Sequence, residues 1–340
     1  MTRRIAVLTA GIVLLLLFGA LGTTMPVPYV AQVPGPTFNT LGDIDGDPII
    51  SVEGRERNEV RGNLNLTTVG VSHKGLSLVQ AVRGWFDDEM AVVPEETVYP
   101  PDRTEEDTRR LNREAFLTSE QAAQSVALGR LGYPEKVVVQ GFAEDSPSAD
   151  ALEEGDALEA VDGRPTPDTD ALDAVLTSIP GGSEITVDFT RLGEPGSATV
   201  TTGTAEEREG SLLGITVLDQ PSAPFDVDIQ VEDVGGPSAG LMLTLGILDL
   251  VGEDDLTGGS VVAGTGTIDG EGNVGPIGGI TLKMVAAAEI DAELFLVPAG
   301  NCEEALGAPD PGFPLARVAT LDDALAALAD VGAGRTPELC

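Results

Sequence analysis

The pattern of apolar and polar positions divides the chain into segments of different character. The first is a continuous apolar run over Ile5–Leu21, with Arg3 and Arg4 before it and no charged residue again until Asp43. This run is slightly short for a transmembrane helix, but the uncharged residues Gly22–Val30 extend it, and the preceding arginines place its N-terminus in the cytoplasm. We therefore predict that residues 1–25 form a single-pass cell-membrane anchor and that the rest is extracytoplasmic. A cleaved signal peptide is the alternative, and it also places the bulk outside.

The next segment, 26–130, starts with a Pro/Gly-rich connection and then mixes strand-like and helical patterns. Strands are predicted at 48–52 and 64–69, and helices at 76–86 and 105–131. One face of the first helix carries Leu78, Ala81, Val82 and Trp85. These patterns predict an N-terminal exterior α/β region. No motif in this segment indicates a catalytic or binding site.

Residues 131–205 contain short strands separated by turn-forming residues. The turn and strand signals are Ser146-Pro147, Leu152-Glu153-Glu154-Gly155-Asp156-Ala157-Leu158 and Val161-Asp162-Gly163, followed by a helix at 168–176 and a strand at 184–190. This order resembles a PDZ domain of the bacterial-protease type. The resemblance implies a small β-barrel that binds peptide C-termini by strand addition. A spacer or a regulatory lid that binds nothing tightly is the alternative.

Residues 206–332 alternate between strand and helix patterns, and 333–340 form a C-terminal tail. Strands are predicted at 214–218, 227–231, 259–264 and 294–297, and helices at 239–250, 282–290 and 321–328. The length of 340 residues also indicates more than one domain. The whole chain is therefore predicted to combine α/β and α+β domains behind an N-terminal transmembrane helix.

Charge narrows the range of partners. The formal net charge is −37, and the sequence has only three lysines, Lys74, Lys136 and Lys283. An acidic surface repels nucleic acid, so we exclude it as a partner. The acidity fits a salt-tolerant or exterior protein, and genome composition is an equal explanation.

A candidate for catalysis lies in the last large segment. Ser238 stands in the turn Gly235-Gly236-Pro237-Ser238-Ala239-Gly240 just before an apolar helix, and Lys283 follows 45 residues later. A neutral lysine can take the proton of a serine, provided that burial lowers the pKa of its amine. The helix N-terminus offers backbone N–H groups to an oxyanion. The sequence has one histidine, His73, which we interpret as an ordinary loop residue.

The same segment resembles the proteolytic domain of the Lon family. The matching residues are Gly236-Pro237-Ser238-Ala239-Gly240, Thr265-Gly266, Pro276-Ile277-Gly278-Gly279, Lys283, Ala286-Ala287 and Pro298. The resemblance implies a Ser238–Lys283 dyad, with Thr265 orienting the lysine amine and Gly236, Pro237, Ala239 and Gly240 shaping the serine turn. With the anchor and the PDZ-like segment, the chain resembles the membrane-anchored, PDZ-containing Lon-like proteases of Gram-positive bacteria and actinobacteria.

The sequence also departs from full-length Lon. It lacks a Gly-x-x-x-x-Gly-Lys-Ser/Thr loop, and Gly235 stands where many ATP-dependent members carry an acidic residue. No metal-ligand spacing is present, so we expect neither metal nor cofactor. The sequence predicts an ATP-independent serine endopeptidase that cleaves unfolded or loosely structured proteins, with homo-oligomerisation left open. The alternatives are a PDZ adaptor with an inactive Lon-like scaffold and a C-terminal-processing peptidase, whose motifs fit less well.

The two cysteines, Cys302 and Cys340, both follow the anchor. An even number of cysteines outside the cytoplasm favours a disulfide, which would tie the C-terminal tail to the segment after Pro298. Two unpaired thiols are the alternative.

Overall fold

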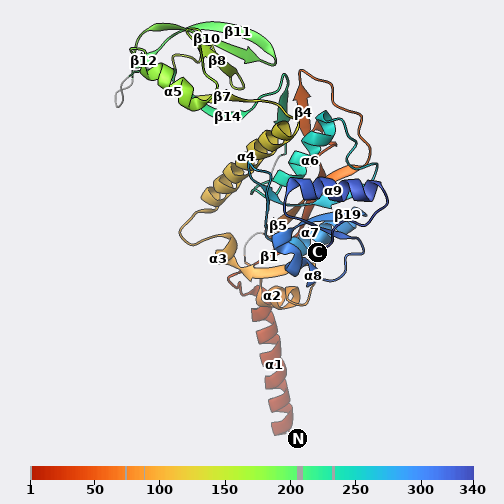
Figure 1. The fold of residues 1–340 in the computed structure, drawn as a ribbon. Helices are drawn as coiled ribbons and strands as arrows, with labels where there is room; N and C mark the ends of the chain where they lie inside the picture. Colours follow the sequence, from red (N-terminus) through yellow and green to blue (C-terminus); the bar gives the residue numbers. More distant parts are fainter. Residues whose placement is uncertain (1, 73–74, 88, 205–209, 232–233) are drawn as a thin grey trace.

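The computed structural model describes residues 2–72, 75–87, 89–204, 210–231 and 234–340, so His73 and Lys74 lie outside the described residues. Figure 1 shows a single helix, α1 (Thr2–Thr24), below a central body, and a smaller lobe at the opposite end of that body. The predicted combination of α/β and α+β domains behind an N-terminal apolar helix is confirmed.

The body is built on one mixed sheet with the strand order β20-β19-β16-β5-β1-β6. Its strands are β1 (Tyr29–Asn39), β5 (Asn63–Val71), β6 (Ala91–Pro94), β16 (Val261–Gly264), β19 (Leu294–Pro298) and β20 (Leu315–Val318). β16 runs parallel to both β5 and β19, whereas β1 is antiparallel to β5 and β6. Strands from both ends of the chain therefore share one sheet, and 26–130 is not a separate region.

Helices cover both faces of this sheet. Successive side chains of β16 and β19 point to opposite faces of the sheet. Val262 and Leu294 point into the core formed with α4 (Glu105–Arg130), α6 (Gly240–Val251) and α9 (Leu321–Gly332). Ala263 and Phe295 point to the other face, where α7 (Ile280–Glu289) and α8 (Cys302–Leu306) lie. Because these strands are buried on both sides, they read as continuous apolar runs.

Short elements complete the body. They are β2 (Asp43–Ile44), β3 (Asp47–Pro48), β4 (Ile50–Glu53), α2 (Leu78–Gly84), α3 (Glu95–Val98), β15 (Asp226–Ile229), β17 (Thr267–Ile268), β18 (Val274–Gly275) and the 3₁₀ turn η1 (Ala299–Asn301).

The smaller lobe has its own sheet and its own apolar core. Its elements are β7 (Glu135–Phe142), β8 (Ala157–Val161), β9 (Arg164–Pro165), α5 (Thr169–Thr177), β10 (Glu184–Arg191), β11 (Glu194–Thr201), β12 (Gly203–Thr204), β13 (Ser211–Leu212) and β14 (Ile215–Pro221). The main strand order is β11-β10-β8-β7-β14, all antiparallel.

The boundary predicted at residue 205 differs from this lobe's extent. β14 pairs with β7 from Ile215 to Pro221, so the lobe continues to residue 221. The Ser222 N–H then donates a hydrogen bond of 3.0 Å to the Pro134 carbonyl. The two ends of the lobe are therefore adjacent, and the lobe is an insertion into the body. A strand pattern at 214–218 cannot show which sheet the strand joins, because pairing is decided by partners far away in sequence.

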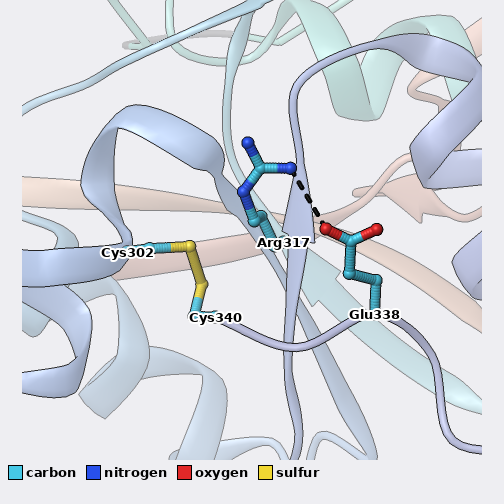
Figure 2. Close-up of a disulfide and its surroundings, with 4 residues drawn as sticks. All are labelled: Cys302, Arg317, Glu338 and Cys340. Carbon is cyan, nitrogen blue, oxygen red and sulfur yellow. Dashed lines mark hydrogen bonds and ion pairs between the residues drawn. A yellow bond between two sulfur atoms is a disulfide. The ribbon is translucent and has the colours of Figure 1, made fainter.

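The C-terminal tail is attached to the body by a disulfide, an ion pair and a backbone hydrogen bond. Cys302 of α8 forms a disulfide with Cys340, and the Arg317 guanidinium contacts the Glu338 carboxylate at 3.2 Å (Figure 2). The Cys340 N–H also donates to the Leu315 carbonyl. The tail thus pairs with β20, which would otherwise end the sheet as an exposed edge.

We expect the disulfide in protein purified without reductant, with intact mass unchanged by thiol alkylation. The bridge closes a loop with a sequence separation of 38. Replacing both Cys302 and Cys340 by serine should lower the free energy of unfolding by about 2–4 kcal/mol, measured by urea denaturation. Two alkylated cysteines in native protein would contradict the bridge.

Candidate active site

Ser238 lies in a turn that leads directly into α6. Gly236 has a φ of 85°, which side chains other than glycine rarely adopt, and so it lets the chain reverse before Pro237. Gly240 is the first residue of α6, where a Cβ atom would lie 2.7 Å from the Ser119 Oγ and 2.9 Å from Ile268. Only glycine allows this close approach, which fixes the half-buried Ser238 at the entrance of a fully buried helix.

Lys283 projects from α7 towards this turn. Its Nζ donates a hydrogen bond of 2.9 Å to the Ser238 Oγ and one of 2.8 Å to the Thr265 Oγ1. The side chain is 2% exposed, and burial lowers the pKa of Lys283 to about 7. A large fraction of the amine is therefore neutral near neutral pH, which is the form that accepts a proton.

Thr265 joins the serine turn to the lysine. It follows β16 and is completely buried. Its hydroxyl accepts from the Lys283 Nζ and donates to the Ser238 carbonyl at 3.0 Å. The Gly266 N–H donates to the same carbonyl at 2.9 Å. Serine, threonine and lysine therefore form a closed hydrogen-bonded set in which the direction of the amine is fixed.

The start of α6 gives the site its electrostatics. Ala239 is 3% exposed and Pro237 is exposed, so one side of the turn is in the core and the other faces solvent. The first N–H groups of a helix have no intrahelical acceptor, and the helix dipole is positive there. This end is suited to stabilising negative charge that develops beside the Ser238 Oγ.

Three supporting residues lie outside the sequence-predicted site. The buried Asn301 side chain accepts from the Ile277 N–H and donates to the Ile277 carbonyl, both at 2.9 Å, and so holds the turn that enters α7. The Ser119 hydroxyl donates to the Pro237 carbonyl at 3.0 Å, and the Gly236 N–H donates to the Asn112 carbonyl. A lone asparagine or serine far from a motif carries no local signal, so sequence reasoning missed them.

The segment that carries this site matches a known family of proteolytic domains. Residues 229–323 match the Lon protease (S16) C-terminal proteolytic domain. The C-terminal part of this chain therefore contains a Lon-type proteolytic domain. Ser238, Thr265 and Lys283 all fall inside the matched range. No curated protein sequence matches the chain.

The insertion in the Lon-like body has its own relatives among solved structures. They include the PDZ domain of the SdrC-like protein from Listeria monocytogenes, with 20% identity and a TM-score of 0.23, covering 24% of this chain and 87% of that chain. The corresponding domain from Listeria innocua has 20% identity and a TM-score of 0.23, covering 24% and 92%. A protein from Geobacillus thermodenitrificans has 24% identity and a TM-score of 0.22, covering 24% and 95%. Values this low carry no conclusion about what the insertion binds.

The chain therefore combines a C-terminal Lon-type proteolytic domain with a small lobe inserted into the body. The family match covers only part of the Lon-like body, because β1 and β5 come from residues before the match. β5 supports the site directly: its buried Thr67 hydroxyl donates to the Gly264 carbonyl at 3.1 Å, next to Thr265. The N-terminal region, which showed no chemistry of its own, thus helps to hold the site.

Replacing Lys283 by methionine should raise the free energy of unfolding at neutral pH by about 1–3 kcal/mol, because the variant no longer buries an ionisable amine. The reason is that the pKa is about 7 when folded and 10.5 in the unfolded chain. Between these values the unfolded chain binds more protons, so wild-type stability rises with pH. The variant's advantage should be largest at or below pH 7 and shrink towards pH 10. Urea denaturation at both pH values checks this, and an unchanged difference would contradict it.

Proposed function

We propose that this protein is an ATP-independent, membrane-tethered serine endopeptidase with a Ser238–Lys283 dyad. The observation that carries the proposal is the buried Lys283 Nζ, 2.9 Å from the Ser238 Oγ. Burial keeps a fraction of the amine neutral, and the contact places that amine where it can remove the serine proton.

The geometry supports a two-step acyl transfer. The Ser238 Oγ attacks the substrate carbonyl carbon while its proton passes to the neutral Lys283 Nζ. The N-terminal end of α6 stabilises the oxyanion that forms. When the intermediate collapses, Lys283 returns the proton to the leaving amide nitrogen, and an amine departs from an acyl-serine. Lys283 then takes a proton from the water molecule that attacks the ester. It returns this proton to the Ser238 Oγ as the ester bond breaks and the carboxylic acid departs, which regenerates both groups. Thr265 holds the amine in line throughout.

The apolar helix α1 supports the tether. Residues Arg3–Thr24 are long and apolar enough to cross a membrane, a property that they share with signal sequences. With Arg3 and Arg4 on the cytoplasmic side, the Lon-like body lies outside. The Cys302–Cys340 disulfide fits this orientation, because disulfides persist in oxidising compartments.

The PDZ-like domain offers a surface for substrate chains. A groove of about 760 Å³ runs between α5 and β14, with Leu172, Leu176 and Val217 among its lining residues. β14 ends its sheet, so its outer edge can pair with an extended peptide. At one end, the Asp219 carboxylate accepts from the Thr169 N–H and hydroxyl, which ties the helix to the strand. Strand addition to this edge requires an extended segment, so the domain would bind unfolded or loosely structured proteins.

The test is casein digestion by the full-length protein in detergent without nucleotide. We expect cleavage at the same rate after ATP is added. An adaptor with an inactive scaffold would show no cleavage under either condition, and strict dependence on ATP would contradict an ATP-independent enzyme.

Deleting the PDZ-like domain should change which substrates are cleaved without destroying the dyad. Because Pro134 and Ser222 are hydrogen-bonded neighbours, residues 135–221 can be replaced by a short glycine linker. We expect cleavage of a short peptide to be retained within about threefold and casein cleavage to fall by about tenfold or more, because strand-addition binding is lost. If both fall equally in a folded protein, the domain has a structural role.

A further inference from the structure

Outside α1, the exposed apolar side chains are concentrated around α2. Beyond Met25, eleven large apolar side chains of the described residues are exposed, and five of them lie between positions 78 and 86. They are Leu78 at 48%, Val79 at 47%, Val82 at 41%, Trp85 at 57% and Phe86 at 86%. The predicted apolar face of this helix therefore points mainly outwards, with only Ala81 buried against the body. We call these five side chains the α2 patch.

The α2 patch lies beside the end of α1. Leaving α1, Pro26 forms a β-bridge with Ser77, and the Val27 N–H donates to the Leu76 carbonyl at 2.8 Å. A Cβ atom on Gly22 of α1 would lie 3.4 Å from a methyl group of Val79. Figure 1 shows α2 at the junction between α1 and the body, crossing the end of α1. The patch is therefore continuous with the apolar surface of α1.

Contacts within the folded body fix the position of the α2 patch. Ser77 and Gln80 form a capping box that starts α2. On the inner side Ala81 packs into a small cluster with Ala31 and Leu76. The Tyr29 ring meets the Trp85 ring edge-on, with centroids 6.0 Å apart. Folded packing thus fixes one face of α2 to the body and leaves the other exposed.

We propose that the α2 patch lies in the headgroup region of the lipid bilayer and forms a second membrane contact. A short helix with one apolar face, aromatic side chains and a basic residue, Arg83, suits this region. An exposed patch of this kind needs an occupant, and continuity with α1 points to lipid rather than to a second copy of the chain. Two contacts, α1 and α2, hold the protease body in one orientation above the membrane. This inference rests on the proposed α1 anchor.

Trp85 provides a direct probe because it is the only tryptophan in the sequence. The full-length protein is placed in nanodiscs of neutral and anionic lipid that hold one copy each. Lipids brominated at shallow or deep acyl positions then quench tryptophan emission on contact. We expect Trp85 about 5–10 Å below the headgroup boundary, with roughly half of its emission lost to shallow bromines and less to deep ones.

Two variants sharpen the test. A double variant, Leu78→Gln with Phe86→Gln, should reduce the quenching by about half or more, because these changes remove apolar contact with lipid. The matched control, Leu306→Gln, alters an exposed leucine on α8 and should leave quenching unchanged. Both variants should cleave casein normally, which shows that the body is folded.

The outcomes separate this inference from the anchor. Protein that resists alkaline carbonate extraction but shows no quenching overturns the α2 contact and leaves the anchor in place. If alkaline carbonate extracts the protein from the membrane, the result overturns both the anchor and the α2 contact. Emission that shifts only when several copies share a vesicle, without bromine quenching, means that a second copy covers the patch and overturns the lipid contact.

Discussion

Ser238→Ala and Lys283→Met should each reduce casein cleavage by the full-length protein by about 10⁴-fold or more, because nucleophile and base act as a unit. The Lys283 Nζ donates directly to the Ser238 Oγ, and the two groups share one proton transfer. The double variant should therefore be no slower than either single variant. Initial rates of casein and peptide cleavage, with circular dichroism to verify folding, provide the measurement.

Two further variants test the assignment. Lys136→Met is the matched control, because Lys136 is the other described lysine and pairs with Glu159 in the PDZ-like domain. It should keep full peptide cleavage. Thr265→Val keeps the shape but removes the hydroxyl that accepts from Lys283, and we expect a loss of about 10–100-fold from misorientation of the amine. Strong cleavage by clean Ser238→Ala protein would overturn the dyad.

Peptide cleavage should fall about tenfold in kcat/KM for each pH unit below the pKa of Lys283. Burial lowers that pKa to about 7. The protonated amine cannot accept the serine proton, so activity rises with pH and levels off above pH 7. The measurement is kcat/KM for a short peptide between pH 5 and 9. A flat profile over this range would contradict a lysine base.

A second group titrates in the same range and must be separated from the first. Glu120 on α4 has a pKa raised to about 7, chiefly by burial, with Asp228 raising it further and Arg113 opposing the shift. Its neighbour Ser119 bonds to the Pro237 carbonyl of the serine turn. Glu120→Gln removes this titration and should leave the pH profile in place. If the profile flattens instead, the acid limb belongs to Glu120.

Local patterns were enough to locate most elements near the site. Three elements depend on side chains that are close together in sequence: the apolar helix α6, the Gly/Pro turn around Ser238 and the helix α7 that carries Lys283. The prediction of a Lon-type domain is confirmed by the family match. The order of Ser238, Thr265 and Lys283 pointed to one site through the resemblance to the Lon proteolytic domain, which alone implied the role of Thr265.

Local patterns could not decide which segments of the chain belong to the same domain. A strand pattern specifies an element that needs a partner, and the partner is chosen by packing and pairing across the chain. Thus β5 joins β16 across almost 200 positions, and β14 joins the PDZ-like sheet instead of the body. The predicted boundary at 205 consequently cuts through the inserted lobe, and the segments predicted as separate regions at 26–130 and 206–332 share one sheet.

The sequence by itself determined the residue types of the site, their order and the apolar helix that begins directly after Ser238. Only the tertiary structure decided how these residues meet, through the 2.9 Å contact of Lys283 with Ser238 and the hydrogen bonds of Asn301 and Thr67. The tertiary structure also decided that the apolar face of α2 points outwards. The physical reason is that a pKa and a hydrogen bond depend on the surroundings of a group. Those surroundings come from strands and helices that are distant in sequence and meet only when the sheet forms.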